Sequence, residues 1–586
     1  MAAVPSPSTD REDPEARARR RTRPPPSAWG PALLVLVVFA ALGWARRWTG
    51  DDAFIVFRVV DQVLAGNGLV YNVGERVEAV TSPLWLAVLV GARAAVPLSV
   101  EWLAVVLGLA LSVTGLGLAT AAAGRLAGDD ASPLVPAGAL VWLGLPPAWD
   151  FATAGLDGGL GLAWMGACAW ALAHLAADDG AAGPGTGVPA PLLATAALVG
   201  LGPVVRPDFA VLSAVWIVAV LLLCRRGGWR VRVALLASAL AVPVVVEVAR
   251  MAYYAALVPT TVLAKEPSVA TWTQGWRYLR NLTDPYLLVV PLGLVLALLV
   301  LGARHVGPRR RLVQLAVALA GLVHAVMVVR GGGDFMHARL LLPGLFAMVL
   351  PVAVVRLRTA TEAAGVTMLA AWALVAGLAL RPPPETTATR DGISDQRAFY
   401  VEQSGHPHPV TLSDFDRYAR VRRGERAGRL EDRGRRALLV NERRWRLHPD
   451  AAPDVVYETG GIGLPGVAAG TDVYILDRLG LADAYTARLR LTERRRAGHD
   501  KPLPMAWVWG RYGVPGSIPH VQQDAARTVR TALACPPLRR LRRAVTTPLT
   551  LHRALANIAA APALTALRFA PEPQAAAAEL CRSDDR

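Results

Sequence analysis

The chain has 586 residues, of which 53% are hydrophobic and only 18% are charged, and its formal net charge is +17. Soluble globular proteins average about 45–50% apolar and about 25% charged residues, so this composition argues against a soluble enzyme, a disordered low-complexity chain and a small disulfide-rich scaffold. A basic chain can bind nucleic acid, but the excess of apolar residues favours a membrane protein, and we expect no nucleic-acid partner.

Residues 1–28 are polar and arginine-rich, and we predict that they form a disordered, basic cytoplasmic tail. Residues 29–380 contain repeated apolar stretches, each near the about 20 residues that a helix needs to cross a bilayer. The sequence therefore predicts a polytopic α-helical membrane domain with about eleven transmembrane helices. The predicted spans are residues 30–45, 102–124, 133–149, 158–175, 190–204, 208–224, 233–250, 286–302, 312–329, 340–355 and 364–380.

The arginine clusters predict the orientation of these spans, because lysine and arginine in short loops stay in the cytoplasm. Such clusters occur in the N-terminal tail and at residues 225–232, 304–311 and 356–358. We therefore predict a multi-pass plasma-membrane protein with a cytoplasmic N-terminus and an extracytoplasmic C-terminal domain. The loops that this arrangement places outside are residues 46–83, 253–284 and 331–339.

Two segments leave the predicted topology open. Residues 84–96 are apolar but short, and counting them as a full span would reverse the side of everything that follows. We interpret them as a kinked or partly inserted segment. Residues 30–45 have a basic flank and small residues at Ala40 and Ala41, so a cleaved signal peptide is the alternative to a first transmembrane helix.

Residues 381–586 have mixed polarity and short strand-like runs such as Asp472–Leu476. This composition is ordinary for a soluble protein, and it predicts an extracytoplasmic α/β domain. Cys535 and Cys581 are the only cysteines in this part of the chain. Because disulfides persist outside the cytoplasm, we expect these two cysteines to form one.

The first external loop begins with two adjacent carboxylates, Asp51 and Asp52. Apolar residues within Phe54–Ala65 have approximately helical spacing, which predicts an amphipathic helix lying along the membrane surface. Such a helix would hold both acids at the boundary between membrane and water. They are then either functional acids or simply solvated groups that stabilise the start of the helix.

Residues 51–85, DDAFIVFRVVDQVLAGNGLVYNVGERVEAVTSPLW, resemble the first periplasmic loop of actinobacterial GT-C glycosyltransferases. In particular they are similar to the terminal β-(1→2)-arabinofuranosyltransferases of the AftB family. Related sequences are also described as flagellar motor control membrane proteins. Further segments that resemble motifs of this family are residues 153–157, 206–208, 253–265, 332–343, 460–463 and 477–481.

The resemblance implies a GT-C fold, a decaprenyl-phosphate-linked arabinofuranose donor in the membrane lipid, and a cell-wall arabinan acceptor (arabinogalactan or lipoarabinomannan). A lipid phosphate near hydrocarbon has to be bound by cations. Lys265 carries extra weight because the chain has only one other lysine, Lys501. The alternative for each cation is a snorkelling residue at the end of a span. The phosphate-binding candidates are Arg58, Arg206, Lys265, His337 and Arg339.

The acids divide into two groups by expected role. Asp51 and Asp52 are the catalytic candidates, with Asp52 nearer the sugar and Asp51 as base or orienting acid. The resemblance implies a retained anomeric configuration, which requires either a carboxylate nucleophile or a same-face reaction. The acids expected to hold cations in place or to contact sugar or acceptor hydroxyls are Glu75, Glu78, Asp157, Asp208 and Asp334.

We expect no essential cofactor and no dedicated metal site, although Asp51, Asp52 and Asp334 are able in principle to bind a divalent cation through their oxygens. Three rival functions remain open from the sequence. One is a related GT-C enzyme that uses another polyprenyl-phosphate sugar, another is a non-enzymatic membrane protein that affects the flagellar motor, and the third is a transporter of lipid-linked sugars. A transporter would be expected to hold its charged residues near the middle of the bilayer.

Overall fold

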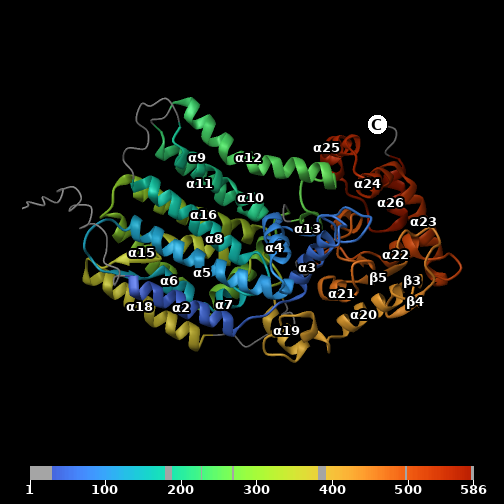
Figure 1. Cartoon of the computed structure of the whole chain (residues 1–586), viewed down its shortest axis with the longest axis horizontal. Coiled ribbons are helices and arrows are strands. Elements are labelled where there is room, and N and C mark those ends of the chain that lie inside the picture. Colours follow the sequence, from blue (N-terminus) through green and yellow to red (C-terminus); the bar gives the residue numbers. More distant parts are fainter. Residues whose placement is uncertain are drawn as a thin grey trace, which may run out of the picture.

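The computed structural model describes residues 29–177, 188–225, 228–266, 269–380, 391–494 and 498–582. The predicted tail, residues 1–28, lies outside these described residues. Figure 1 shows a bundle of long helices on one side of the molecule and a smaller C-terminal domain on the other. The helix α3 (Asp51–Leu64) lies where the two parts meet.

Among the described residues, five helices are long and apolar enough to cross a membrane, judged by length and composition. They are α5 (Val100–Leu126), α8 (Gly158–Ala177), α12 (Trp229–Tyr254), α16 (Pro308–Arg330) and α18 (Ala360–Leu378). Shorter apolar helices complete the bundle: α2 (Gly30–Ala45), α9 (Ala190–Gly200), α10 (Gly202–Val205), α11 (Ala210–Leu223) and α15 (Val289–Ala303). The chain is therefore a mostly helical membrane protein.

Small residues bring α5 and α8 into close contact at the centre of the bundle. A side chain at Gly115 would lie 2.4 Å from the backbone of Leu162, and one at Gly159 would lie 2.2 Å from the carbonyl oxygen of Gly108. Glycine at these positions lets the two backbones approach, as is common between membrane helices. This contact also fixes the start of α8, which directly follows Asp157.

Two predicted spans are not single helices, and the prediction was wrong there. Residues 133–149 form the strand β1 (Leu134–Pro136) and the short helices α6 (Gly138–Leu143) and α7 (Pro146–Phe151). Residues 340–355 form α17 (Leu342–Val349), a 3-10 turn η3 (Leu350–Val352) and the strand β2 (Val354–Arg356). Proline lacks a backbone N–H and breaks the helical hydrogen-bond ladder, and the two broken segments instead pair as antiparallel strands.

The segment 84–96, which the sequence left open, forms the short helix α4 (Pro83–Ala95). Thirteen residues extend about 20 Å, less than the about 30 Å of a hydrocarbon core. The charges of Glu101, in the first turn of α5, and of Arg93, near the end of α4, both affect the pKa of Asp61 in α3, so the end of α4 lies near α3. Since α4 begins and ends beside α3, it does not reach the far end of the bundle.

The arginines of the predicted cytoplasmic loops gather at one end of the bundle. Arg310 pairs with Asp129 at 2.6 Å, and Arg358 pairs with Asp130 at 2.7 Å. Arg309 donates hydrogen bonds to the carbonyl oxygens at the ends of α8 and α11. Figure 1 shows the C-terminal domain at the opposite end of the bundle.

The C-terminal domain contains a four-stranded sheet in the order β4-β3-β5-β6. Three of its strands are parallel, and β4 pairs antiparallel at the edge. The buried strands are rich in Val, Leu, Ile and Tyr, as expected where helices cover both faces. The strands are β3 (Ala437–Val440), β4 (Arg443–Trp445), β5 (Val455–Thr459) and β6 (Tyr474–Asp477), and the helices include α19 (Gln396–Ser404), α20 (Ala419–Glu431), α21 (Gly463–Ala468) and α22 (Met505–Tyr512).

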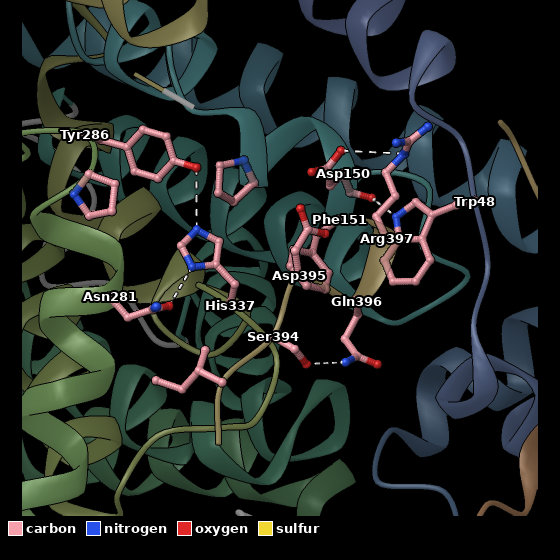
Figure 2. Close-up of a pocket in the computed structure, with 13 residues that line it drawn as sticks. Trp48, Asp150, Phe151, Asn281, Tyr286, His337, Ser394, Asp395, Gln396 and Arg397 are labelled. Atoms are coloured by element: carbon pink, nitrogen blue, oxygen red, sulfur yellow. Dashed lines mark hydrogen bonds and ion pairs between the residues drawn. The ribbon is translucent and has the colours of Figure 1, made fainter. Parts of the chain in front are cut away.

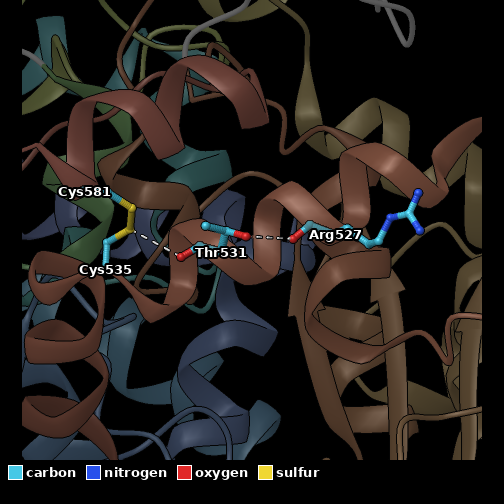
Figure 3. The surroundings of a disulfide bond; sticks show 4 residues. All are labelled: Arg527, Thr531, Cys535 and Cys581. Carbon is cyan, nitrogen blue, oxygen red and sulfur yellow. Dashed lines mark hydrogen bonds between the residues drawn. A yellow bond between two sulfur atoms is a disulfide. The ribbon is translucent and has the colours of Figure 1, made fainter.

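The last helices of this domain are joined by a disulfide. Figure 3 shows the bond between Cys535, which follows α23 (Gln523–Ala534), and Cys581 at the end of α26 (Pro573–Cys581). The two Cα atoms are 5.1 Å apart. The pairing expected from the sequence is thus present in the structure. The helices α24 (Pro536–Thr546) and α25 (Leu551–Ala566) lie within the loop that it closes.

The helix α3 forms as predicted, but the side that was expected to face water is covered by protein. Every residue from Ala53 to Val60 is buried, because the C-terminal domain covers the side of α3 that was expected to face water. The N-terminal end of α21 packs against the start of α3, and a side chain at Gly463 would lie 1.7 Å from the carbonyl oxygen of Asp51. The acids of the first loop are therefore held between the two parts of the molecule.

Candidate active site

Asp52, the second residue of α3, forms the centre of a charged cluster at the end of the bundle that faces the C-terminal domain. Its Oδ2 atom accepts a hydrogen bond of 2.9 Å from Nη1 of Arg339. The same Nη1 atom lies 3.6 Å from Oδ2 of Asp334, whose other oxygen accepts the backbone N–H of Phe335. Two predicted external loops, 46–83 and 331–339, thus meet at one arginine.

Arg206 forms the second half of this cluster. It lies between α10 and the 3-10 helix η2 (Pro207–Phe209), where its Nε and Nη2 atoms donate to the two oxygens of Asp208 at 3.0 and 3.3 Å. Its Nη1 atom lies 3.4 Å from Oδ1 of Asp157. Asp208 is itself 2.9 Å from Nε2 of His324. A two-fold contact of this kind fixes the plane of a guanidinium group, so Arg206 is rigidly oriented.

A glycine turn positions Asp334 and Arg339. Gly332 and Gly333 have φ angles of +91° and +77°, which residues other than glycine rarely adopt. A side chain at Gly333 would also lie 2.2 Å from the ring of Tyr278. The Tyr278 hydroxyl donates to the carbonyl of Met336 and accepts the N–H of Leu340, which fixes the rest of the loop.

Asp52 and Lys265 line two adjoining cavities. The larger one, which we call the central cavity, has a volume of about 280 Å³ and lies between the membrane domain and the C-terminal domain. The smaller one, which we call the inner cavity, has a volume of about 70 Å³ and also contacts Arg339. Apolar residues of α3 and of the loop that follows it, among them Ile55 and Val80, line the inner cavity. A ligand at Asp52 would therefore meet a polar space on one side and a partly apolar space on the other.

Lys265 ends the short helix α13 (Thr260–Lys265). Within the part of the chain that the structure describes, its ammonium group has no hydrogen bond and no ion pair. The other lysine is different, since the Nζ atom of Lys501 donates to the carbonyls of Leu263 and Ala487 and to Glu266. Lys265 is thus a cation at a cavity wall that is available to an anionic ligand.

Asp51 lies at the wall of the central cavity, but its carboxylate faces the C-terminal domain. Its oxygens accept the backbone N–H groups of Ile462, Gly463 and Leu464 at 3.1, 3.1 and 2.8 Å. Burial raises its pKa above the usual value of an aspartate, and the N–H groups of Gly463 and Leu464 offset only part of this rise. The sequence paired Asp51 with Asp52 as a catalytic candidate. In the structure, the carboxylate of Asp51 is instead bound by the backbone N–H groups of residues 462–464.

Arg58 is not part of the charged cluster, contrary to its predicted role as a phosphate ligand. Its side chain is only 1% exposed, and it donates hydrogen bonds to the backbone carbonyls of Tyr71, Gly470 and Val473 at 3.0, 2.6 and 2.8 Å. Another carbonyl, that of Gly466, accepts from Nη1 as well. With its donors directed at the backbone, Arg58 joins α3 to the C-terminal domain.

Glu75 and Glu78 also lie away from the cluster. Glu75 accepts a hydrogen bond from the hydroxyl of Tyr474, and burial raises its pKa to about 7. Glu78 forms an ion pair with Arg250 of α12 at 2.7 Å. These two acids attach the loop to the C-terminal domain and to the bundle, which is a supporting role at most.

His337 faces a third space, shown in Figure 2, although it is only two residues from Arg339. Its Nδ1 atom is 2.6 Å from Oδ1 of Asn281, and its Nε2 atom is 3.5 Å from the hydroxyl of Tyr286. Burial lowers the pKa of His337 to about 4, so the imidazole is uncharged at neutral pH. The structure therefore does not support its predicted role as a phosphate-binding cation.

Several residues of the central cavity were missing from the sequence prediction, among them Tyr418, Arg420 and His499. The guanidinium of Arg420 lies 6.0 Å from the ring centre of Tyr418, and the ring of His499 contacts Phe335 at 5.5 Å. Arg420 stands in a helix with many arginines, so no sequence signal distinguished it from surface residues.

The acids considered as ligands of a divalent cation, Asp51, Asp52 and Asp334, all have other partners. Asp51 is directed at backbone N–H groups, and Asp52 and Asp334 share Arg339. Among the described residues, no group of three or more His, Cys, Asp or Glu side chains is arranged to hold a metal ion.

Comparison with known proteins covers nearly the whole chain. Residues 441–578 match the model of the AftB family C-terminal domain. The chain is 34% identical over 603 aligned residues to a terminal β-(1→2)-arabinofuranosyltransferase of Mycobacterium tuberculosis, covering 91% of this chain and 94% of that protein. It is 32% identical over 586 residues to the protein of the same name from Corynebacterium glutamicum, covering 90% and 84%. No solved structure matches the chain.

Proposed function

The chain belongs to the family of terminal β-(1→2)-arabinofuranosyltransferases, and we propose that it transfers arabinofuranose from a decaprenyl-phosphate donor to cell-wall arabinan at the outer face of the plasma membrane. It is a glycosyltransferase by this membership. The donor, the acceptor and the side of the membrane are the parts that we propose.

The observation that carries the proposal is the position of Asp52 between the two cavities, with Arg339 on one side and Lys265 near by. The inner cavity combines these cations with an apolar wall, which suits the phosphate and the first part of a lipid chain. Arg206 and Arg339 also line a space of about 40 Å³ beside Phe151 and Leu342, deeper in the bundle. The central cavity is more polar and suits the acceptor glycan.

In the proposed reaction the bond between C1 of the sugar and the phosphate oxygen breaks, and the phosphate leaves with the bonding electrons. Lys265, Arg206 and Arg339 stabilise the negative charge that develops on it. Binding of the phosphate draws Arg339 away from Asp52, which frees that carboxylate to face C1. Asp52 then acts either as nucleophile or as the group that stabilises an oxocarbenium-like sugar in a same-face reaction. The acceptor hydroxyl next forms its bond to C1, displacing Asp52 where Asp52 is the nucleophile, and its proton passes to the phosphate that has left.

Asp51 has a different role in this proposal. Because its oxygens accept three backbone N–H groups, it is a positioning residue that holds α3 and the loop at residues 460–464 together. We also propose that the reaction needs no essential divalent cation, because Lys265 and Arg339 line the inner cavity and Arg206 lines the space beside it, where they can offset the charge of a phosphate.

The proposed orientation follows from the two ends of the bundle. The arginine-rich loops at one end are cytoplasmic by the positive-inside rule, and the charged cluster with the C-terminal domain is outside. The cluster lies at the end of the bundle rather than at its middle, which favours an enzyme over a transporter that would bind its substrate near the midplane.

The test is transfer from radiolabelled decaprenyl-phosphate-arabinose to a short arabinan by membranes that contain the Asp52→Asn variant. We expect kcat to fall about 10²–10⁴-fold, the usual range for loss of a group that acts in the transition state. Asp61→Asn, which changes an acid of the same helix outside both cavities, is the matched control. Undiminished transfer by Asp52→Asn at equal protein level would overturn the proposal.

A further inference from the structure

The third space, which we call the His337 cavity, has a volume of about 200 Å³. It lies between α7, α14 (Trp272–Thr283), the loop at residues 331–341 and the start of α19. Figure 2 shows its polar side chains arranged around one space, among them His337, Asn281, Tyr286 and Asp395. Drug-sized ligands occupy about 300–1,000 Å³, so the cavity has room for a smaller group.

The charges around this cavity do not favour a phosphate. Asp150 forms an ion pair with Arg46 and lies 3.9 Å from Nε of Arg397, so both arginines face a carboxylate. A second acid, Asp395, also lines the cavity. The imidazole of His337 directs one nitrogen at the amide oxygen of Asn281 and the other at a tyrosine hydroxyl. An uncharged ligand fits these groups better than an anion.

Aromatic rings complete the wall. Trp48, Phe151 and Tyr286 line the cavity, and the indole N–H of Trp48 donates to the carbonyl of Asp150 at 2.8 Å, which fixes the ring. Rings with an apolar face beside hydroxyl, amide and carboxylate groups suit a sugar, whose C–H face packs on a ring while its hydroxyls form hydrogen bonds.

The His337 cavity adjoins the central cavity. Ser394 and Gln396 line both spaces, and the amide of Gln396 donates to the hydroxyl of Ser394 at 2.6 Å. A glycan whose end lies beside Asp52 therefore has a second polar and aromatic space next to the central cavity.

We propose that the His337 cavity is an acceptor subsite, which binds a neutral sugar unit of the glycan some units away from the one that is glycosylated at Asp52. This inference rests on the proposed function and extends it. His337 and Asn281 hold the distal sugar by hydrogen bonds, and Tyr286 forms part of the ring wall. The subsite makes the enzyme prefer a long acceptor to a short one.

Acceptor kinetics test this subsite. In the His337→Ala variant we expect the ratio of kcat/KM for an arabinan hexasaccharide to kcat/KM for a disaccharide to fall about tenfold, the effect of losing a hydrogen bond to a bound ligand. His337→Gln, which keeps a hydrogen-bonding group, should restore part of the ratio. His406→Ala, an exposed histidine, is the matched control and should leave the ratio as it is. An unchanged ratio in His337→Ala would overturn the subsite.

A labelling experiment separates the subsite from the reaction. The described free cysteines, Cys168 and Cys224, are buried, so an Asn281→Cys variant adds a thiol in the cavity that a methanethiosulfonate reagent can modify. We expect the hexasaccharide to slow this modification at least threefold, and the disaccharide to slow it little. Equal rates with and without the hexasaccharide would overturn the subsite, whereas loss of the proposed function would appear instead as undiminished transfer by Asp52→Asn.

Discussion

Charged residues of the same kinds lie in two places: at the surface where α3 contacts the C-terminal domain, and in the cavities beside it. The two sets differ in how many hydrogen-bond partners they have. At the contact surface, Asp51 accepts three backbone N–H groups and Arg58 donates to several carbonyls. At the cavities, Asp52 has one described side-chain partner, Arg339, and Lys265 has none among the described residues. Buried charges with a full set of partners hold a structure together, whereas charges with unused hydrogen-bonding capacity can bind a ligand.

The largest effect on stability is expected at Arg58. In the Arg58→Met variant, the buried carbonyls that it serves lose their donors, and we expect the free energy of unfolding to fall by about 3–5 kcal/mol. Thermal unfolding of the purified protein in detergent measures this loss. Arg426→Met, at an exposed position of α20, is the control. If the Arg58→Met protein were stable and had lost only its binding of the lipid-linked sugar, the result would support the predicted role of Arg58 as a phosphate ligand.

The two lysines provide the next comparison. In Lys265→Met we expect the KM for the lipid donor to rise about 10–100-fold, because a charged hydrogen bond to phosphate contributes about 1.5–3 kcal/mol, while the unfolding temperature stays the same. Lys501→Met removes a buried cation that has three partners and should lower the unfolding temperature instead. If both variants changed the same quantity, the distinction between contact surface and cavity would fail.

Helix geometry decides how far the sequence predicts which residues of α3 lie at the contact surface and which line the cavities. Residues seven apart share a face of a helix, so Asp51 and Arg58 point the same way, and Asp52 points with Ile55 and Val56 into the inner cavity. The sequence brought the right loops together at Asp52. It did not separate Asp51 from Asp52, because the backbone that Asp51 holds lies more than 400 residues further along the chain.

The separation of His337 from Arg339 has a local cause that the sequence hides. Ala338, between them, has a φ angle of +65°, a left-handed conformation that is uncommon for residues other than glycine. The chain reverses there, so that His337 faces one cavity and Arg339 another. The broken spans at residues 133–149 and 340–355 had a visible signal, since prolines interrupt both, but apolar length alone favoured continuous helices.

A smaller effect is expected at Asp51. An asparagine has one amide oxygen to offer, so Asp51→Asn should lose at least one of the three N–H contacts and about 1–2 kcal/mol of stability. The rate of transfer per folded molecule should remain within about threefold of the wild type, far from the loss expected for Asp52→Asn. Parallel measurement of unfolding and of initial rates at equal folded protein checks both. A loss of rate as large as that of Asp52→Asn would make Asp51 a catalytic residue.

The smallest effect concerns Asp61, an acid of α3 that belongs neither to the contact with residues 462–464 nor to the cavities. Burial, and next the charge of Glu101, raise its pKa to about 6, against about 3.9 in an unfolded chain. A carboxyl group whose pKa is raised by folding favours the folded state below the unfolded pKa, and this contribution is lost as the pH rises through 6. Asp61→Asn should therefore gain about 1 kcal/mol over the wild type between pH 4 and pH 7, because partial exposure weakens the effect. Unfolding curves at several pH values measure this gain, with exposed Asp432→Asn as the control. A difference that stayed constant with pH would mean that the pKa of Asp61 is the same in the folded and the unfolded chain, and would contradict this prediction.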